Sequence, residues 1–357
     1  MKIVCLGGGI STERQVSLVT ATSVCRALRS RGHQAIFVDM FLGLEDFDGA
    51  LEAAFDAPDG FCGSASIGTE APDIAAVIAS RKLKSRSRLG KNVLELCALA
   101  DFVFLGLHGA DGEDGKIQAT LDLLGVPYNG SDSLSSGMAM DKAVGKRIME
   151  SCGVLTPRWQ ELSYCEEDIP ALTETLPVPC AVKIVDGGSS IGVELPETRE
   201  QLKAALYNIL RFGSRVVVEE KIVGREMTVP ILDDRYLSAI EIVPPEGSSF
   251  DYTAKYQSGA AAAQEICPAR ITEAEWRQMG EAALKYHKAL GLSVYSRTDF
   301  ILTDDGRAYC LEVNTLPGMT PASLIPKAAK VEGLSYEELC EKIVMLSLAE
   351  RGKTALC

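Results

Sequence analysis

The first forty residues contain a strand, a glycine turn and a helix in immediate succession, and no other feature limits the fold as much. An apolar run at 2–6 leads into three glycines at 7–9, and a helical pattern follows from about 15 to 31. Two later apolar runs, at 35–38 and 101–107, have the length of buried strands. Strands that alternate with helices are typical of βαβ units. The beginning of the chain is therefore expected to form a parallel α/β sheet.

Length and composition indicate how many domains the chain has and which kinds of partner its charge disfavours. At roughly 100–200 residues per domain, the 357 residues predict two or three domains. The 49 acidic residues exceed the 36 Lys and Arg, and the resulting formal charge of −13 argues against nucleic-acid or anionic-membrane partners. The eleven cysteines include no C-x-x-C pair, as expected for reduced thiols in the cytoplasm. No apolar stretch is long enough to span a bilayer, and the amino terminus reads as a strand rather than a signal peptide.

The glycines at 7–9 invite comparison with the dinucleotide-binding pattern G-x-G-x-x-G, which would imply a nicotinamide-dependent dehydrogenase. Position 12 is threonine, so the third glycine is missing, and Asp39 lies farther along than the acidic residue of that pattern. A tight strand-to-helix turn is the better interpretation. Tight NADH binding without ATP binding would revive the dehydrogenase hypothesis. Glu13, at the helix start, has an ordinary explanation as a partner of the helix dipole.

A lysine and a Gly/Ser loop stand together at 183–192, which read Lys-Ile-Val-Asp-Gly-Gly-Ser-Ser-Ile-Gly. One cation and several backbone N–H groups suit a phosphate group. The spacing differs from the P-loop pattern G-x-x-x-x-G-K-[ST], and a flexible glycine turn is the plain structural alternative. The segment favours a phosphate site over that alternative.

A β-hairpin signature lies between residues 295 and 314. Two strand-like runs, 295–302 and 307–313, flank Asp305-Gly306, a favoured two-residue hairpin turn. With that turn, Asp299 lies opposite Glu312, and side chains alternate between the two faces. One face is expected to carry Arg297, Asp299, Cys310, Glu312 and Asn314, and the other Thr298, Phe300, Leu311 and Val313. A slip of one residue would separate the first set, so the prediction depends on the register.

The polar face of this hairpin has the composition of a metal site. Two carboxylates directly opposite each other repel unless a positive charge lies between them. Asp299, Glu312 and Asn314 offer oxygen ligands, which suit Mg²⁺ or Mn²⁺ and not a structural zinc ion. Magnesium usually accompanies substrate phosphates, which the loop after Lys183 could bind. The alternative, a solvated hairpin face, is weakened by Arg297 on the same face.

Eight segments together resemble the D-alanine–D-alanine ligase family of the ATP-grasp superfamily. They are Gly8-Gly-Ile-Ser-Thr-Glu-Arg-Gln-Val-Ser, Leu107-His-Gly-Ala-Asp-Gly-Glu-Asp-Gly, Glu312-Val-Asn-Thr-Leu-Pro-Gly-Met-Thr, and residues 140–142, 183–192, 219–221, 251–256 and 297–299. The resemblance implies an α/β and α+β protein, an ATP-grasp fold with an N-terminal Rossmann-like parallel-sheet domain. The implied units are 1–130 for substrate, 131–222 as the central ATP-grasp subdomain and 223–357 as the C-terminal one. Residues 41–92 match poorly and receive no functional assignment.

The resemblance implies an ATP-dependent carboxylate–amine ligase. ATP would phosphorylate one D-alanine, and the amine of a second would attack the acyl phosphate to give D-alanyl-D-alanine, ADP and phosphate for peptidoglycan synthesis. A homodimer is also implied. D-serine or D-lactate as the second substrate is the nearest alternative, although Tyr256 favours an amine over the D-lactate hydroxyl. The complete set of Arg297, Asp299, Glu312 and Asn314 disfavours a nucleotide-binding regulatory module without chemistry.

The resemblance also implies roles for residues that bind the nucleotide and metals. Lys142 and Lys183 would hold the ATP phosphates, residues 220–223 would form the adenine-binding strand, and Glu226 would bind the ribose. Lys255 and Arg297 would meet the transferred phosphoryl group. The full nucleotide set is Lys142, Lys183, Ser190, Glu220, Lys221, Val223, Glu226 and Lys255, and the ligands of two Mg²⁺ or Mn²⁺ ions are Asp299, Glu312 and Asn314.

For the two amino acids, the resemblance assigns Glu13 to the ammonium of the first D-alanine. Ser189 and Tyr256 would tie the loop at 252–263 over the site, where it excludes water. The Gly318 N–H and Arg297 would stabilise the oxyanion, and Arg297 would also bind the second carboxylate. The implied catalytic set is Glu13, Ser189, Tyr256, Arg297 and Gly318, and the implied substrate-binding set is His108, Ser323 and Leu324. His287 is expected on a helix surface without a role in the site.

Overall fold

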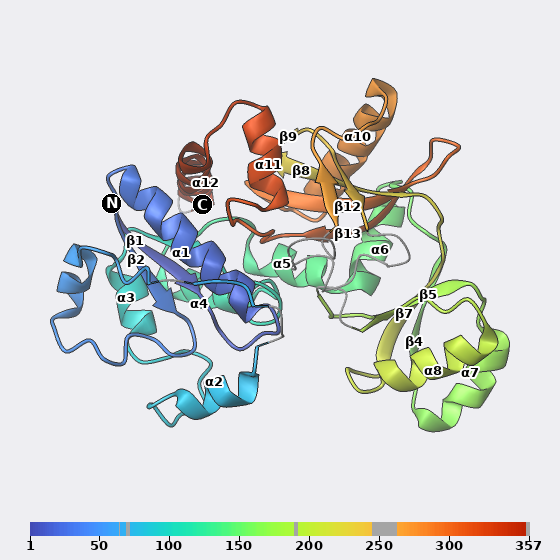
Figure 1. The fold of residues 1–357 in the computed structure, drawn as a ribbon, viewed down its shortest axis with the longest axis horizontal. Helices are drawn as coiled ribbons and strands as arrows, with labels where there is room; N and C mark the ends of the chain where they lie inside the picture. Colours follow the sequence, from blue (N-terminus) through green and yellow to red (C-terminus); the bar gives the residue numbers. More distant parts are fainter. Residues whose placement is uncertain (64, 69–71, 189–191, 245–262, 355–357) are drawn as a thin grey trace.

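The computed structural model of the chain describes residues 1–63, 65–68, 72–188, 192–244 and 263–354. Three β-sheets organise it, with helices packed on their faces (Figure 1). The N-terminal sheet and the sheet at 159–220 lie toward opposite ends of the molecule, and the third sheet lies between them. In these described ranges, no helix has the length and apolar character needed to cross a lipid bilayer.

The N-terminal sheet is parallel, as the alternation of strands and helices predicted. In the order β2-β1-β3, β1 (Lys2–Gly7) lies between β2 (Gln34–Asp39) and β3 (Phe102–Leu105). Most of β1 and all of β3 are buried, which explains why both read as continuous apolar runs. The helical segments here are α1 (Arg14–Ser30), η1 (Leu51–Asp56), α2 (Ile74–Ser80), α3 (Val93–Leu99) and α4 (Lys116–Leu124).

The second sheet is antiparallel, in the order β4-β7-β5-β6. Its strands are β4 (Trp159–Ser163), β5 (Cys180–Ile184), β6 (Val193–Glu194) and β7 (Arg215–Glu220). The helical segments beside it are η2 (Glu166–Asp168), α7 (Ile169–Thr175) and α8 (Arg199–Ile209), while α5 (Ser133–Met140) and α6 (Lys142–Ser151) pack against β13 (Ala308–Asn314) of the third sheet. The helix α6 begins at Lys142 because the Asp141 carboxylate caps it, accepting the Val144 N–H at 2.9 Å.

The third sheet is built around the hairpin. The strand order is β11-β10-β8-β12-β13, and β9 pairs with β8. Its strands are β8 (Arg225–Leu232), β9 (Arg235–Tyr236), β10 (Ile240–Val243), β11 (Gln264–Ile266), β12 (Tyr295–Leu302) and β13 (Ala308–Asn314). The remaining helices are α10 (Glu273–Ala289), α11 (Leu324–Val331) and α12 (Tyr336–Thr354).

The predicted hairpin register is correct at the polar face. Asp299 pairs with Glu312, and Arg297 pairs with Asn314. Nearer the turn it is wrong by one residue, because residues 303–307 connect the strands instead of a two-residue turn. A β-bulge between Asp299 and the next residue absorbs the difference.

The bulge changes which side chains face the core. Cys310 pairs with Phe300 and is fully buried in a hydrophobic cluster, so its prediction on the polar face was wrong. Leu311, predicted on the core face, instead lines a pocket together with Glu312. The bulge therefore presents two consecutive side chains to the pocket.

The C-terminal helices share a core with the N-terminal sheet. Ile325 and Ile343 lie in the same buried cluster as Ile3, and α12 crosses α1 (Figure 1). His287 was wrongly expected on a helix surface: it is 1% exposed, and its Nδ1 lies 2.7 Å from Ser296 Oγ. Burial lowers the pKa of His287 to about 4, so this imidazole is a neutral core group at pH 7.

Candidate active site

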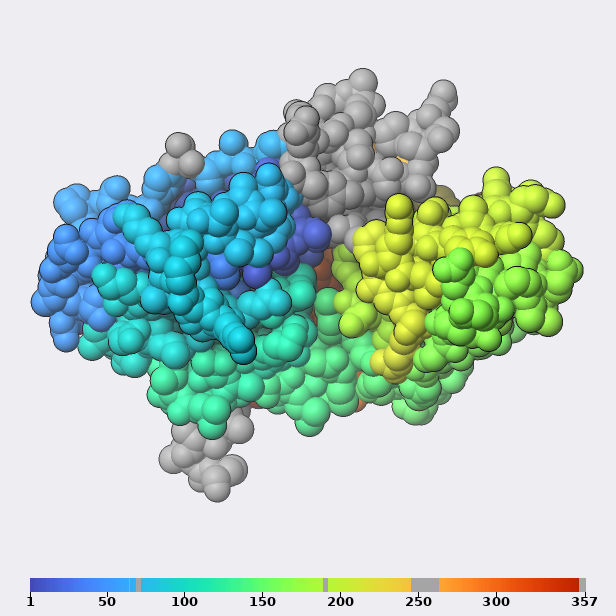
Figure 2. All heavy atoms as spheres, turned by 90° about the horizontal axis from the view of Figure 1, so that it is seen from below, coloured from blue at the N-terminus to red at the C-terminus, as the bar shows by residue number. Residues whose placement is uncertain are grey.

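Two adjoining pockets form the candidate site. One, called the Glu13 pocket, is lined by Glu13, Arg297 and Ser323 among others and has a volume of about 360 Å³. The other, called the Lys183 pocket, is lined by Lys183 and Asp299 among others and has a volume of about 420 Å³. The residues that line both are Lys142, Gly187, Gly188 and Glu312. Figure 2 shows a hollow in the surface between the N-terminal residues, blue to cyan, and the green to yellow residues of the second sheet. Two molecules bound side by side in these pockets would meet at their shared wall.

Buried charges are paired at the base of the Lys183 pocket. Glu219, 2% exposed, lies on β7 with Lys183 Nζ at 3.0 Å and Lys146 Nζ at 3.1 Å. Burial opposes ionisation of Glu219, but attraction to the two ammonium groups holds its pKa below the usual value. Burial alone would lower the pKa of Lys183, yet attraction to Glu219 and Glu312 outweighs it and raises that pKa. Lys183 is therefore a fixed, permanently charged cation at the pocket wall.

Lys142 is held between the two pockets by the start of α6. Its backbone N–H donates to Val185 O at 3.0 Å, and its ammonium donates to Gly187 O. Lys142 Nζ also lies 3.2 Å from Glu312 Oε2. These contacts join α6, the loop after β5 and the hairpin at one point. A phosphate group that crosses from one pocket to the other would pass this ammonium.

The hairpin supplies an arginine held by a carboxylate. Arg297 Nε and Nη2 each donate to Asp299 at 3.0 Å, and Thr228 donates to the same carboxylate at 2.6 Å. A two-point guanidinium–carboxylate contact fixes the plane of the arginine as well as its position. Arg297 lines the Glu13 pocket, whereas Asp299 lines the Lys183 pocket. The pair therefore joins the two pockets.

The residues predicted to hold metal ions fit Mg²⁺ or Mn²⁺. Asp299 and Glu312 face each other across the two strands, and Asn314 follows two residues later. Asn314 Oδ1 is buried and accepts no hydrogen bond from any described residue, although buried oxygens are normally satisfied. A hard cation bound by two carboxylates and this amide oxygen would supply the missing partner.

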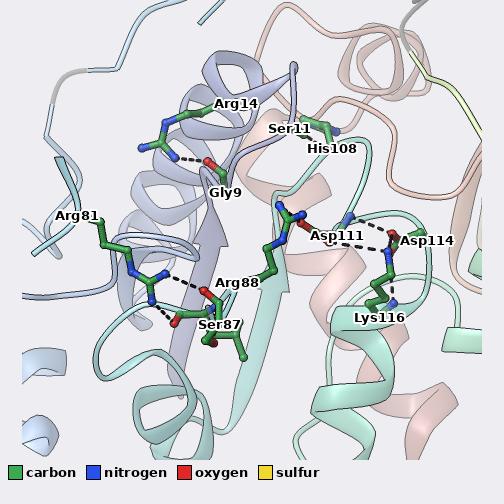
Figure 3. Close-up of polar contacts among 11 residues, drawn as sticks. Gly9, Ser11, Arg14, Arg81, Ser87, Arg88, His108, Asp111, Asp114 and Lys116 are labelled. Atoms are coloured by element: carbon green, nitrogen blue, oxygen red, sulfur yellow. Dashed lines mark hydrogen bonds and ion pairs between the residues drawn. The ribbon is translucent and has the colours of Figure 1, made fainter. Parts of the chain in front are cut away.

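The Glu13 side of the site is held in position by His108. Its Nδ1 lies 3.0 Å from Leu316 O and its Nε2 lies 3.1 Å from Thr20 Oγ1, while Ser11 donates to His108 O at 2.8 Å (Figure 3). A carbonyl only accepts, so Nδ1 carries the proton and Nε2 accepts from the threonine. Burial lowers the pKa of His108, which keeps the ring neutral. The histidine thus links α1, its own loop and the turn after β13.

Glu113 is a buried carboxyl that the sequence analysis did not single out. It lines the Glu13 pocket and accepts the Gly109 N–H at 2.7 Å. Burial, followed by repulsion from Glu13, raises the pKa of Glu113 to about 8. The sequence did offer a signal for Glu113, because this acidic residue lies in the motif at 107–115, only a few positions after His108.

The turn after β13 brings three further predicted residues together. Gly318, Ser323 and Leu324 line the Glu13 pocket. Ser323 Oγ accepts the Thr320 N–H at 3.0 Å, and a Cβ on Gly318 would lie only 3.0 Å from that oxygen. A side chain at position 318 would therefore press on Ser323, which would have to shift by a few tenths of an ångström.

Most of the predicted residues within the described ranges line one of the two pockets. The Glu13 pocket contains Glu13, His108, Lys142, Arg297, Glu312, Asn314, Gly318, Ser323 and Leu324. The Lys183 pocket contains Lys142, Lys183, Glu220, Lys221, Glu226, Asp299 and Glu312. Val223 lines neither and is 81% exposed, although its neighbour Ile222 lines the second. The residues outside the described ranges are Ser189, Ser190, Lys255 and Tyr256.

Comparisons with known proteins identify the family. The family described as D-ala D-ala ligase N-terminus matches residues 2–131, and that described as D-ala D-ala ligase C-terminus matches 143–345. A D-alanine–D-alanine ligase from Pediococcus pentosaceus is 40% identical over 352 residues, 97% of each chain. A Bacillus anthracis D-alanine–D-alanine ligase structure complexed with ATP has 29% identity, a TM-score of 0.70 and 99% coverage of both chains.

A structure with a different named substrate is also similar. The VanG D-Ala:D-Ser ligase from Enterococcus faecalis matches with 29% identity and a TM-score of 0.73, covering 97% of this chain and 99% of its own. Both halves of the chain are thus matched by the family, in the order and with the lengths of whole relatives. The chain belongs to the D-alanine–D-alanine ligase family, whose members have the ATP-grasp fold.

Proposed function

We propose that this chain joins two D-alanine molecules, at the expense of ATP, to give D-alanyl-D-alanine, ADP and phosphate for peptidoglycan precursors. The observation that carries the proposal is the pair of adjoining pockets that share Lys142 and Glu312. A nucleotide in the Lys183 pocket would present its terminal phosphate at this wall to a carboxylate in the Glu13 pocket. The relatives named as D-alanine–D-alanine ligases and the ATP-bound neighbour support the same reaction.

Transfer of a phosphoryl group depends mainly on positioning and on neutralising charge on the phosphate oxygens. Lys142 and Lys183 would bind the triphosphate, and Glu219 would keep the Lys183 ammonium oriented. Residues 220–223 and Glu226 would bind the adenosine, with Ile222 and Ile301 forming apolar walls. Ser190 and Lys255 are proposed to join this set on the strength of the family resemblance.

Two Mg²⁺ or Mn²⁺ ions are proposed to be held by Asp299, Glu312 and Asn314, where they would supply positive charge to offset the negative charge of the phosphate groups. The orphaned Asn314 oxygen supports this assignment. Arg297, fixed by its two contacts with Asp299, would meet the transferred phosphoryl group and then the oxyanion. The Gly318 N–H would donate to the same oxyanion.

The two D-alanines would occupy different sides of the Glu13 pocket. Glu13 would accept hydrogen bonds from the ammonium of the first, whose carboxylate oxygen attacks the terminal phosphorus of ATP and displaces ADP. Ser323 and Arg297 would bind the carboxylate of the second, beside Leu324. The amine of the second D-alanine would then attack the carbonyl carbon of the acyl phosphate, and phosphate would leave. Ser189 and Tyr256 are proposed to close the site.

D-serine as second substrate is the closest alternative, because a VanG D-Ala:D-Ser ligase is among the similar structures. A small apolar pocket rejects one added hydroxyl only weakly, by about 10²-fold in a known case. We expect D-alanyl-D-alanine to be the main product when both acceptors compete.

The test measures ADP release with Mg²⁺-ATP and D-alanine, and then repeats it with D-serine or D-lactate added while the products are identified by mass spectrometry. D-alanine-dependent ADP release with matching dipeptide supports the proposal. ADP release that does not require D-alanine refutes it, and a predominance of D-alanyl-D-serine establishes the alternative.

We also propose that the enzyme works in the cytoplasm as a homodimer, on the strength of the family resemblance and the cysteine usage. Sedimentation velocity at micromolar concentration tests the dimer. A single species with the mass of one 357-residue chain would contradict it.

A further inference from the structure

Residues 41–92 received no functional assignment from the sequence, yet a short segment of this region reaches the site. Ile67 lines the Glu13 pocket, together with Glu13 and Val16. It lies 51 residues after Val16 in the chain, between η1 and α2. The segment formed by residues 62–63 and 65–68 therefore contributes an apolar side chain to the pocket that contains Glu13.

The segment is tied to α1 at two points. Arg26 donates to Cys62 O at 2.6 Å and also to Gly63 O, while the Gly68 N–H donates to Gln15 Oε1 at 2.8 Å. Gln15 and Arg26 are eleven residues apart, which is about three helical turns, so both lie on one face of α1. Cys62 itself is buried in the N-terminal core. These hydrogen bonds therefore hold Ile67 next to the start of α1.

The burial of Ile67 fits a role in the pocket better than a role in folding. Its side chain is half-buried, and it belongs to none of the hydrophobic clusters formed by the described residues. Its side chain lines the pocket, as does that of Val16, which is 3% exposed. Both side chains therefore belong to the α1 side of the pocket, where Glu13 lies, whereas Ser323 comes from the turn after β13.

We infer that Ile67 is a specificity-determining residue for the first D-alanine, closing the apolar side of its subsite so that a methyl side chain fits and a longer one is excluded. This inference rests on the proposed function, because it uses Glu13 as the binding group for the first ammonium. Gln15 acts as a positioning residue, since its contact with Gly68 fixes where the isoleucine lies.

The test uses Ile67→Ala in the full-length enzyme with D-alanine and D-2-aminobutyrate, which is one methylene longer. Fragmentation mass spectrometry of the mixed dipeptides shows which amino acid supplied the carboxyl and which the amine. We expect the ratio of kcat/KM for D-2-aminobutyrate over D-alanine as first substrate to rise about tenfold or more, the usual range for one methylene. The product should be D-2-aminobutyryl-D-alanine, with the choice of second substrate unchanged.

Matched variants separate this effect from general damage. Ser66→Ala changes the exposed neighbour, which lines neither pocket, and should leave the ratio as in the wild type. Ile67→Val should give a smaller rise than Ile67→Ala, and Gln15→Met, which removes the acceptor for Gly68, should also raise the ratio. Equal melting temperatures of the variants would show that folding is intact.

The outcomes are distinct. An unchanged ratio in Ile67→Ala, or a rise confined to D-alanyl-D-2-aminobutyrate, overturns the inference while wild-type turnover of D-alanine upholds the proposed function. Absence of D-alanine turnover in the wild type refutes the proposed function and the inference together.

Discussion

Replacing Glu219 with glutamine should destabilise the protein strongly, because this carboxylate is the shared partner of two buried ammonium groups. Lys146 Nζ and Lys183 Nζ lie 3.1 and 3.0 Å from its oxygens, and the side chains of Lys146 and Glu219 are only 1% and 2% exposed. A glutamine of the same size would turn an N–H₂ donor toward one of the two ammoniums. Removing one partner of a buried ion pair costs about 3–5 kcal/mol, and we expect a loss in this range for Glu219→Gln.

Urea denaturation at pH 7 measures this loss, with Glu220→Gln as the matched control for stability. Glu220 is the next residue on β7 but pairs with Arg158, whose side chain is 89% exposed, so its loss should cost about 1 kcal/mol or less. The pKa of Glu219 lies below its ordinary value of 4.5. Its stabilisation is therefore present above pH 4.5 and lost as the pH falls through the lowered pKa, so wild type and variant should converge in acid. Equal losses for the two variants at pH 7 would refute this reasoning.

Three further changes test other parts of the site. Glu312→Gln should lower kcat by about 10²-fold or more through loss of a proposed metal ligand; kinetics across a Mg²⁺ titration measure this, and a wild-type kcat would exclude the ligand role. The pKa of Glu113 is raised from 4.5 to about 8, so the free energy of unfolding of the wild type should fall as the pH rises from 4.5 to 8. Urea denaturation of Glu113→Gln should show a weaker dependence of this free energy on pH. An unchanged pH dependence would contradict the burial of this carboxyl as its cause. Gly318→Ala should displace Ser323 and raise KM for the second D-alanine about tenfold, whereas an unchanged KM would mean that the turn yields without cost.

Local signals in the sequence predicted the elements that carry the site. The parallel N-terminal sheet followed from strand–helix alternation, and the pairing of Asp299 with Glu312 followed from side-chain alternation near a turn. The sequence failed where the backbone departs from regular geometry. The five-residue connection at 303–307 and the bulge exchange the faces on which Cys310 and Leu311 were predicted to lie. No residue type there signals a bulge.

The sequence analysis missed other residues because their roles depend on contacts between residues that are distant in the sequence. Glu219 and Glu220 are adjacent on β7, and only the packing of Lys146 against that strand shows which one is buried. Ile67 lies in a region without a matching motif, and its neighbour Gly68 is held by Gln15, more than fifty residues earlier. Such residues can be found from the sequence only after the fold has brought the segments together.

In the proposed reaction, the carboxylate of the first D-alanine is phosphorylated before the peptide bond forms. The most direct measurement uses D-alanine with both carboxylate oxygens replaced by ¹⁸O, Mg²⁺-ATP and the wild-type enzyme, followed by mass analysis of the phosphate released. The acyl phosphate route transfers one carboxylate oxygen to phosphorus, so each phosphate should contain one ¹⁸O atom. Phosphate without ¹⁸O, released in step with dipeptide, would show that the peptide bond forms without an acyl phosphate.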